Sequence, residues 1–201
     1  MSNPIKFYFA CVSPWSYLAL EALKAIAEEH GRTVAYKPTH VGRQWEETSA
    51  GRPLGDRPEV LQAYRLVELP RWAAWRDIPL NPEPKHFPVS FLLSSRVIIA
   101  AGQAGVDMHE ITRGLMRGCW ADEKNIDDAD DVSAIADGLG LAGAALVAAA
   151  ESDSVTSELQ ANTDESLADG AWSVPSMVVD GELFFGQDRL EMIDWRLSTA
   201  T

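Results

Sequence analysis

Two serines flank a proline and a tryptophan near the start of the chain, in Ser13-Pro14-Trp15-Ser16. The segment follows a short apolar run and opens a pattern typical of a helix, so a hydroxyl and free backbone N–H groups meet at a helix N-terminus. Such a place can hold an anion. The simpler interpretation is a helix cap, with Ser13 as N-cap and Pro14 at the first helical position. Both interpretations remain open at this point.

A second stretch whose residues could serve binding or catalysis lies near the other end of the chain. Gly186-Gln187-Asp188-Arg189 opens the last predicted helix. Asp188 there is a good N-cap, and its charge suits the positive end of the helix dipole.

The elements that must position these residues form two groups at the ends of the chain. Residues 4–12 and 33–37 are predicted as strands joined by a helix over 14–30, a connection long enough for a parallel pair. Residues 176–179 and 182–185 are predicted as a hairpin around Asp180-Gly181, a favoured turn between antiparallel strands. A last helix over 188–197 follows, so the two ends predict one mixed sheet in an α/β fold.

The middle of the chain is predicted to be almost entirely helical. Residues 40–58 are expected to form a loop with one helical turn at 44–48, and residues 78–88 an extended segment. Pro70 is expected to kink or split a helix over 59–77. Further helices are predicted over 89–105, 107–120, 127–138, 141–150 and 154–170. We therefore predict one domain of residues 1–39 plus 171–201, with residues 40–170 as an inserted helical domain.

Composition excludes several classes of function. The chain has 201 residues, 46% of them hydrophobic and 23% charged, which is typical of a globular protein, and its net charge is −13. That charge argues against nucleic acid or an anionic membrane as a partner. Two distant cysteines, Cys11 and Cys119, make no disulfide framework. Without a visible leader or apolar span, we expect a cytoplasmic protein, and we expect no metal site.

Three stretches carry a resemblance to a known family. They read FYFACVSPWSYLALEAL, HFPVS and ANTDESLADGAWSVPSMVVDGELFFGQDRLEMI. With a βαβ and ββα frame and a helical insertion, the chain resembles the disulfide-oxidoreductase branch of the thioredoxin fold. Within it, the chain is similar to kappa-class glutathione transferases and, more closely, to 2-hydroxychromene-2-carboxylate isomerases.

The resemblance implies a glutathione site around Ser13. Oxidoreductases of this fold use Cys-Pro-x-Cys at the turn, and both cysteine positions are serine here, which excludes dithiol exchange. The thiol would instead come from glutathione, with Ser13 donating a hydrogen bond that lowers its pKa. A cis Val174–Pro175 step would offer the Val174 backbone to the tripeptide. The remaining contacts implied by the resemblance come from Phe185, Gly186, Gln187 and Asp188.

The insertion is expected to hold the second substrate, a small aromatic compound. Arg43, Arg52, Pro53 and His86 are the expected substrate contacts, and Arg57 lies in the same loop. Candidates for an aromatic wall, each also a candidate core residue, are Trp45, Trp72, Trp75, Phe87 and Trp120. We expect Cys11 and Cys119 to be core residues and not nucleophiles. The resemblance also implies a homodimer.

Several positions differ from the family pattern. Glu46 and Leu61 stand where the family tends to have lysine, and Ser90 stands where an asparagine is usual. The predicted function is a glutathione-dependent isomerase of a conjugated carbonyl or carboxylate compound. The alternatives are a kappa-type glutathione transferase or peroxidase, which would share the Ser13 site, and a redox-inactive binding protein.

Overall fold

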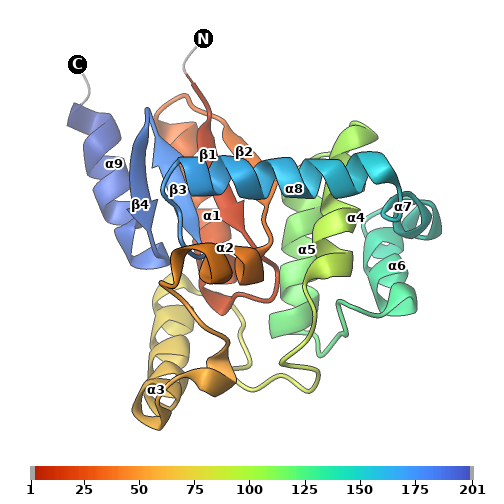
Figure 1. Cartoon of the computed structure of the whole chain (residues 1–201), viewed down its shortest axis with the longest axis horizontal. Coiled ribbons are helices and arrows are strands. Elements are labelled where there is room, and N and C mark those ends of the chain that lie inside the picture. The colour runs from red at the N-terminus through yellow and green to blue at the C-terminus, as the bar shows by residue number, and fades with distance from the viewer. Residues whose placement is uncertain (1–2, 200–201) are drawn as a thin grey trace.

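A four-stranded mixed sheet lies in the left half of the view in Figure 1, with helices of the insertion to its right. The structure is a computed structural model in which residues 3–199 are described. The strands are β1 Ile5–Phe9, β2 Val34–Pro38, β3 Ser176–Val179 and β4 Glu182–Phe185, and their order in the sheet is β2-β1-β3-β4. β1 pairs parallel with β2 and antiparallel with β3, and β3 pairs antiparallel with β4. This arrangement confirms the predicted mixed sheet built from both ends of the chain.

Local sequence explains the connections within the sheet. Helix α1, Pro14–Glu29, provides the crossover between β1 and β2, and Ser13 caps its start. The β3–β4 hairpin turns at Asp180 and Gly181, whose φ angles are +49° and +85°. Two consecutive positive φ angles match the twist of the flanking strands, and Asp-Gly tolerates them well. The Arg32 guanidinium donates two hydrogen bonds to Asp180 and holds the pKa of that carboxyl below its usual range.

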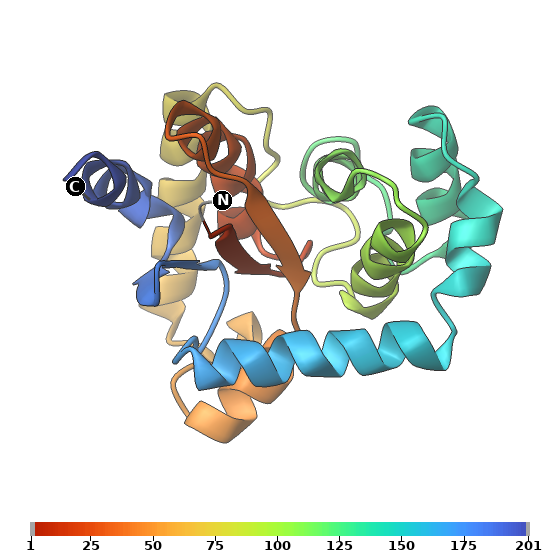
Figure 2. The same cartoon turned by 90° about the horizontal axis from the view of Figure 1, so that it is seen from above.

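Seven α-helices separate β2 from β3 among the described residues. They are α2 Val41–Thr48, α3 Glu59–Arg76, α4 Leu92–Gln103, α5 Met108–Trp120, α6 Ala129–Gly138, α7 Gly143–Ala149 and α8 Asp153–Ala168. A short 3₁₀ helix, η1 Leu54–Asp56, precedes α3, and η2 Gln187–Arg189 leads into α9 Leu190–Thr199. Figure 2 shows α8 running as a long bar from the α6–α7 end of the molecule back to the sheet. It thereby returns the chain from the insertion to β3.

Two details of the insertion differ from the sequence prediction. Helix α2 begins at Val41, three residues before the predicted turn, because the His40 side chain caps it by accepting the Arg43 N–H at 3.0 Å. Helix α3 runs unbroken through Pro70, so of the two predicted effects, a kink or a split, the split is wrong. Pro70 is exposed, and on an exposed face water can satisfy the carbonyl that a proline leaves without its helical donor.

One hydrophobic core joins the sheet to the insertion. The largest cluster of buried side chains includes Phe7 and Phe9 of β1 together with Ile98 of α4 and Ile111 of α5. The proposed division at residues 39/40 and 170/171 therefore stays a prediction from sequence, and its outermost residues, 1–2 and 200–201, lie outside the described part. Across residues 3–199, every helix is too short or too polar to cross a lipid bilayer.

Candidate functional site

The turn at Ser13 combines a helix cap with an open side chain. Ser13 has extended backbone angles, φ −89° and ψ 114°, and its Oγ accepts the Ser16 N–H at 3.2 Å. The first turn of α1 contains no acidic residue, so nothing on the helix itself neutralises its positive end. Accepting that bond leaves the Ser13 O–H free to donate elsewhere. The cap and the anion site, which the sequence left as alternatives, are therefore compatible.

The segment before β3 faces this turn and has an unusual backbone. The Val174–Pro175 peptide bond is cis, as the resemblance implied, and a second cis bond lies at Phe87–Pro88, which the sequence analysis did not anticipate. Among the described residues, the N–H and C=O of Val174 take part in no hydrogen bond. The Pro175 carbonyl accepts the Gly186 N–H at 2.9 Å. This bond ties the cis step to the turn that follows β4.

That turn depends on a glycine and an arginine. Gly186 has φ +98°, and a Cβ there would lie 2.4 Å from Asp188 Oδ1. Gln187 is buried, and its carbonyl accepts a hydrogen bond of 3.2 Å from Arg76 Nη2. Arg189 pairs with Asp188 at 2.9 Å. Helix α3 thus anchors the start of η2 through its C-terminal arginine.

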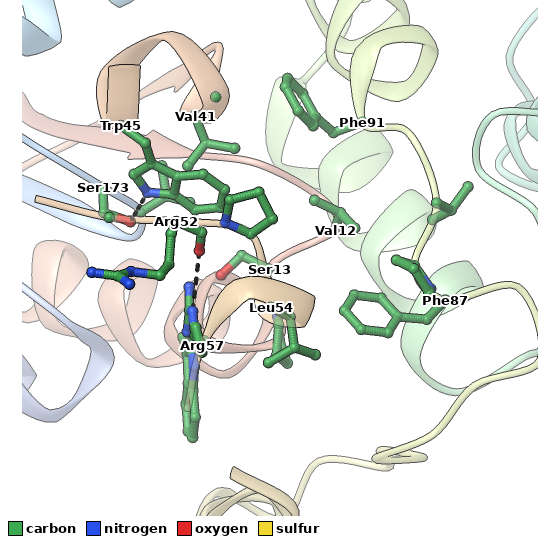
Figure 3. A pocket seen from close by; sticks show the side chains of 18 of the residues that line it. Val12, Ser13, Val41, Trp45, Arg52, Leu54, Arg57, Phe87, Phe91 and Ser173 are labelled. Atoms are coloured by element: carbon green, nitrogen blue, oxygen red, sulfur yellow. Dashed lines mark hydrogen bonds between the residues drawn. The ribbon is translucent and has the colours of Figure 1, made fainter. Parts of the chain in front are cut away.

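The first of two adjoining cavities lies beside Ser13 and has a volume of about 530 Å³. Its walls come from the Ser13 turn, α2, the loop around η1, α3 and the segment that carries the cis Phe87–Pro88 bond. Figure 3 shows Ser13 near the centre of the labelled side chains, with Trp45 and Phe91 towards the top of the view and Leu54 and Arg57 below. Aromatic and aliphatic side chains make most of this wall.

Trp45 is held firmly at one side of the first cavity. Its indole N–H donates to Ser173 Oγ at 3.0 Å, and the Arg57 guanidinium lies 6.0 Å from its ring centre (Figure 3). A Cβ on Gly51 would lie 2.1 Å from the ring. Only glycine at position 51 therefore lets the loop pass this close to the indole.

The second cavity has a volume of about 380 Å³ and lies between α3 and the turn after β4. The residues that line both cavities are Trp15, Arg57, Arg65 and Val174. Leu61, Tyr64, Glu68 and Trp72 of α3 form one wall of the second cavity. The opposite wall consists of Val174, Pro175, Phe185, Gly186, Gln187 and Asp188. The two cavities therefore meet beside Trp15, next to Ser13.

The structure brings most of the predicted site residues together. All six residues expected beside Ser13 for glutathione line the second cavity, while Ser13, Arg52 and Pro53 line the first. Arg43 and His86 line neither cavity. Arg43 instead pairs with Glu47 and Asp164 at 2.6 Å each.

The residues of the predicted aromatic wall lie in three kinds of place: the cavities, the core and the surface. Trp45 and Phe87 line the first cavity, and Trp72 lines the second. Trp120 is completely buried in the core, and Trp75 is 76% exposed. Sequence spacing could not separate these cases, because each tryptophan suits both a core and a pocket.

Sequence reasoning named Trp72 of α3 but missed the rest of that helix's contribution, above all Arg65. This arginine is 8% exposed and lines both cavities. It stands four residues before Leu69 and eight before Ala73, both buried, so it shares their helix face. A charged residue on an apolar helix face was the available signal.

Both cysteines are buried, as predicted. Cys11 is fully buried and Cys119 is 2% exposed, and neither forms a disulfide. Burial raises the pKa of the Cys11 thiol far above its usual range, and burial raises the pKa of Cys119 to about 12. Neither group is a thiolate at neutral pH, so this chain's own sulfur supplies no nucleophile to the site.

The comparisons with known proteins agree with this fold. The family model for the DSBA-like thioredoxin domain matches residues 4–198. A 2-hydroxychromene-2-carboxylate isomerase of Sphingobium xenophagum is 29% identical over 198 residues, which cover 96% of this chain and 97% of the relative. Glutathione s-transferase kappa 2 of Caenorhabditis elegans is 27% identical over 203 residues, covering 94% and 89% of the two chains.

A solved structure also matches along almost the whole chain. It is a 2-hydroxychromene-2-carboxylate isomerase with a TM-score of 0.82 and 25% sequence identity, covering 96% of this chain and 94% of the other. Its fold therefore extends through the insertion as well as the sheet. On the match over residues 4–198, the chain belongs to the DSBA-like thioredoxin domain family.

Proposed function

We propose that this protein is a glutathione-dependent isomerase of a small conjugated aromatic carbonyl or carboxylate compound. The observation that carries the proposal is the junction of two cavities at Trp15 and Val174, beside Ser13. One has a wall made of the residues expected to hold glutathione, and the other is larger and mostly apolar. Relatives named as an isomerase and as a glutathione S-transferase support the same chemistry.

The residues of the second cavity fit a peptide thiol. Gly186 has no Cβ, and a Cβ at this position would collide with Asp188. The Val174 backbone N–H and C=O are available to pair with an extended peptide. Asp188 offers a carboxylate for an ammonium group, beside the positive end of the last helical segment. We assign Val174, Pro175, Phe185, Gly186, Gln187 and Asp188 to this role.

Bound glutathione would supply a thiolate that adds reversibly to a conjugated carbonyl compound, so that a double bond would become single and rotate. The double bond would re-form as the new carbon–sulfur bond breaks and the thiolate leaves. Ser13 donates its free O–H to the sulfur, and the N-terminus of α1 favours the negative charge there. Trp45 and Phe87 cover the neighbouring space and limit water access, which strengthens both interactions. Holding the two reactants together makes their encounter effectively unimolecular.

The first cavity would hold the second substrate. Arg52 and Pro53 line it and keep their assigned role, whereas Arg43 and His86 line neither cavity and have no role in this proposal. Glu46 also lines this cavity, and Leu61 lines the other, so the departures from the family pattern fall at the site itself. They leave the identity of the aromatic substrate to experiment.

The decisive test is turnover of 2-hydroxychromene-2-carboxylate with and without glutathione, followed by mass spectrometry. An isomer of unchanged mass, formed only when glutathione is present and is recovered intact, supports the proposal. A stable conjugate would instead make the protein a kappa-type transferase. No turnover together with no calorimetric binding of glutathione at millimolar concentration would make it a binding protein of another class.

Two further parts of the proposal concern assembly and location. A homodimer is supported by exposed apolar side chains along α3, with Val60 72%, Tyr64 54% and Val67 47% exposed. Light scattering on the purified protein tests it, and a mass of one chain at micromolar concentration would contradict it. A cytoplasmic location suits two free cysteines and a need for reduced glutathione.

A further inference from the structure

Arg76, the last residue of α3, contacts both walls of the second cavity without lining it. Its Nη2 donates to the backbone carbonyl of Gln187 at 3.2 Å and to the side-chain Oε1 of Gln187 at 3.4 Å. The same nitrogen pairs with Glu191 of α9 at 3.1 Å. The guanidinium carbon lies 5.6 Å from the ring centre of Trp72. Trp72 belongs to one wall of the cavity and Gln187 to the other, so a single side chain joins the two.

Arg76 supplies the polar connection between these walls. Across residues 3–199, each hydrogen bond and ion pair that joins α3 to residues 174–199 comes from this side chain. The apolar face of α3 is held elsewhere, because Leu69 and Ala73 pack with Leu18 of α1 in a separate buried cluster. That packing fixes α3 against α1 and leaves its spacing from the turn after β4 to Arg76.

The bond from Arg76 also fixes the backbone of the opposite wall. The peptide unit between Gln187 and Asp188 is trans and planar, so a hydrogen bond to the Gln187 carbonyl sets the orientation of the whole plane. Gln187 is buried, which leaves water little access to replace the donor. Asp188 follows directly and lines the cavity. Arg76 therefore acts one peptide plane away from a residue proposed to contact the ligand.

Folding stability explains an arginine at this position poorly. The Arg76 Nε is buried without a hydrogen-bond partner in the described part of the chain, which costs free energy. Its carboxylate partner, Glu191, is exposed, and ion pairs with an exposed partner contribute little. An apolar side chain of similar length would pack against Trp72 without the cost of burying a charge. The contacts with Gln187 therefore indicate a role in the site.

We propose that Arg76 is a positioning residue of the second cavity, which holds the turn at Gln187 and Asp188 at the distance from Trp72 that bound glutathione needs. Arg76 does not touch the ligand, and it acts through the carbonyl of Gln187. The inference rests on the proposed function, because that function assigns glutathione to this cavity. Affinity for glutathione then depends on a residue that lies outside both cavities.

Calorimetric titration of the whole chain with glutathione separates positioning from folding. The dissociation constant reports the geometry of the site, whereas the stoichiometry reports the folded fraction. Arg76→Met should weaken binding about tenfold at unchanged stoichiometry, because loss of a hydrogen bond from a charged donor reduces the fraction of molecules with the competent turn. Arg76→Lys should weaken binding about threefold, because the charge remains and one donor can still reach a carbonyl.

Arg196→Met is the matched control, since Arg196 joins α9 to Glu182 of β4 at 2.9 Å and neither residue lines a cavity. It should bind glutathione as the wild type does, and so should Glu191→Gln, which keeps the bonds between Arg76 and Gln187. Wild-type affinity in Arg76→Met overturns the proposal, whatever the stoichiometry. Should that variant not fold, wild-type affinity in Arg76→Lys overturns it. An equal loss of affinity in Glu191→Gln would assign the effect to α9 and also overturn it.

Turnover measurements distinguish failure of this inference from failure of the proposed function. Wild type that binds glutathione, loses affinity through Arg76→Met and yet isomerises nothing supports the role of Arg76 and contradicts the proposed function. Conversely, isomerisation by the wild type with an equal KM for glutathione in Arg76→Met overturns the inference alone. Wild type that binds no glutathione overturns both.

Discussion

Ser13 makes two interactions that different substitutions should separate. Its Oγ accepts the Ser16 N–H at the start of α1, and its O–H faces the first cavity, where it is proposed to donate to a thiolate. Alanine removes both functions. Aspartate keeps the cap, since Asp and Ser are comparable N-caps, but it brings a negative charge to the proposed thiolate. Stability and activity should therefore respond differently in the two variants.

The expected changes in stability and in thiol pKa each follow from the loss of one hydrogen bond. Loss of an N-cap costs about 1 kcal/mol of unfolding free energy. With an unfolding entropy of about 2.1 cal/mol/K per residue, that lowers the Tm by roughly 2 °C in a chain of this length. A hydrogen bond to a charged group contributes about 1.5–3 kcal/mol, so its removal should raise the pKa of the bound thiol by roughly 1–2 units.

Two measurements on the same samples test this reasoning. Calorimetric melting should give a lower Tm for Ser13→Ala and an unchanged one for Ser13→Asp. Thiolate absorbance of bound glutathione against pH should show a raised thiol pKa in both, with isomerisation near pH 7 reduced about tenfold or more. Ser16→Ala is the matched control, because the Ser16 Oγ is buried without a partner among the described residues, and its loss should change neither quantity. Wild-type turnover and an unchanged thiol pKa in Ser13→Ala would refute the catalytic role.

Three further predictions concern the frame of the site. Gly186→Ala should lower the unfolding free energy by about 1–3 kcal/mol through backbone strain and weaken glutathione binding, whereas Gly138→Ala, with open space and an ordinary φ, should be neutral in both melting and calorimetry. Asp180→Asn should lower stability at pH 7, because the pKa of Asp180 is depressed in the folded state. The difference from wild type should vanish in urea melts as pH falls from about 4 through the folded pKa, and a constant difference would contradict this. Cys11 and Cys119 should resist iodoacetamide at pH 8 until the protein unfolds, and rapid labelling of the native protein would disprove their burial.

Local sequence patterns were sufficient to predict most of the strands and turns of the sheet. The strand at 176–179, its return at 182–185 and the Asp180-Gly181 turn were predicted with the bounds that the structure has. These elements depend on interactions within a few residues, such as side-chain alternation and tolerance of positive φ. Helix α2 was predicted too short because its cap is a histidine, which is not a usual capping residue.

Local sequence patterns predicted only part of the candidate site. The motifs around Val174 and Gln187 identified one wall of the second cavity, and the motif at Ser13 identified part of the first, because each lies at the end of a strand or the start of a helix. The opposite wall comes from α3, which resembles an ordinary amphipathic helix in sequence. Which of its faces meets the turn after β4 depends on packing, as does the burial of Arg65 between two rings.

The sequence by itself determined that Ser13 could not exchange disulfides and that it would cap a helix, because both follow from the chemistry of a hydroxyl and its immediate neighbours. Only the tertiary structure decided that this turn opens onto two cavities, one balanced in charge and one with an excess of arginine. The physical reason is the distance along the chain between the contributing residues. Ser13, Arg65 and Gln187 meet only after the sheet joins the two ends and α3 packs across them.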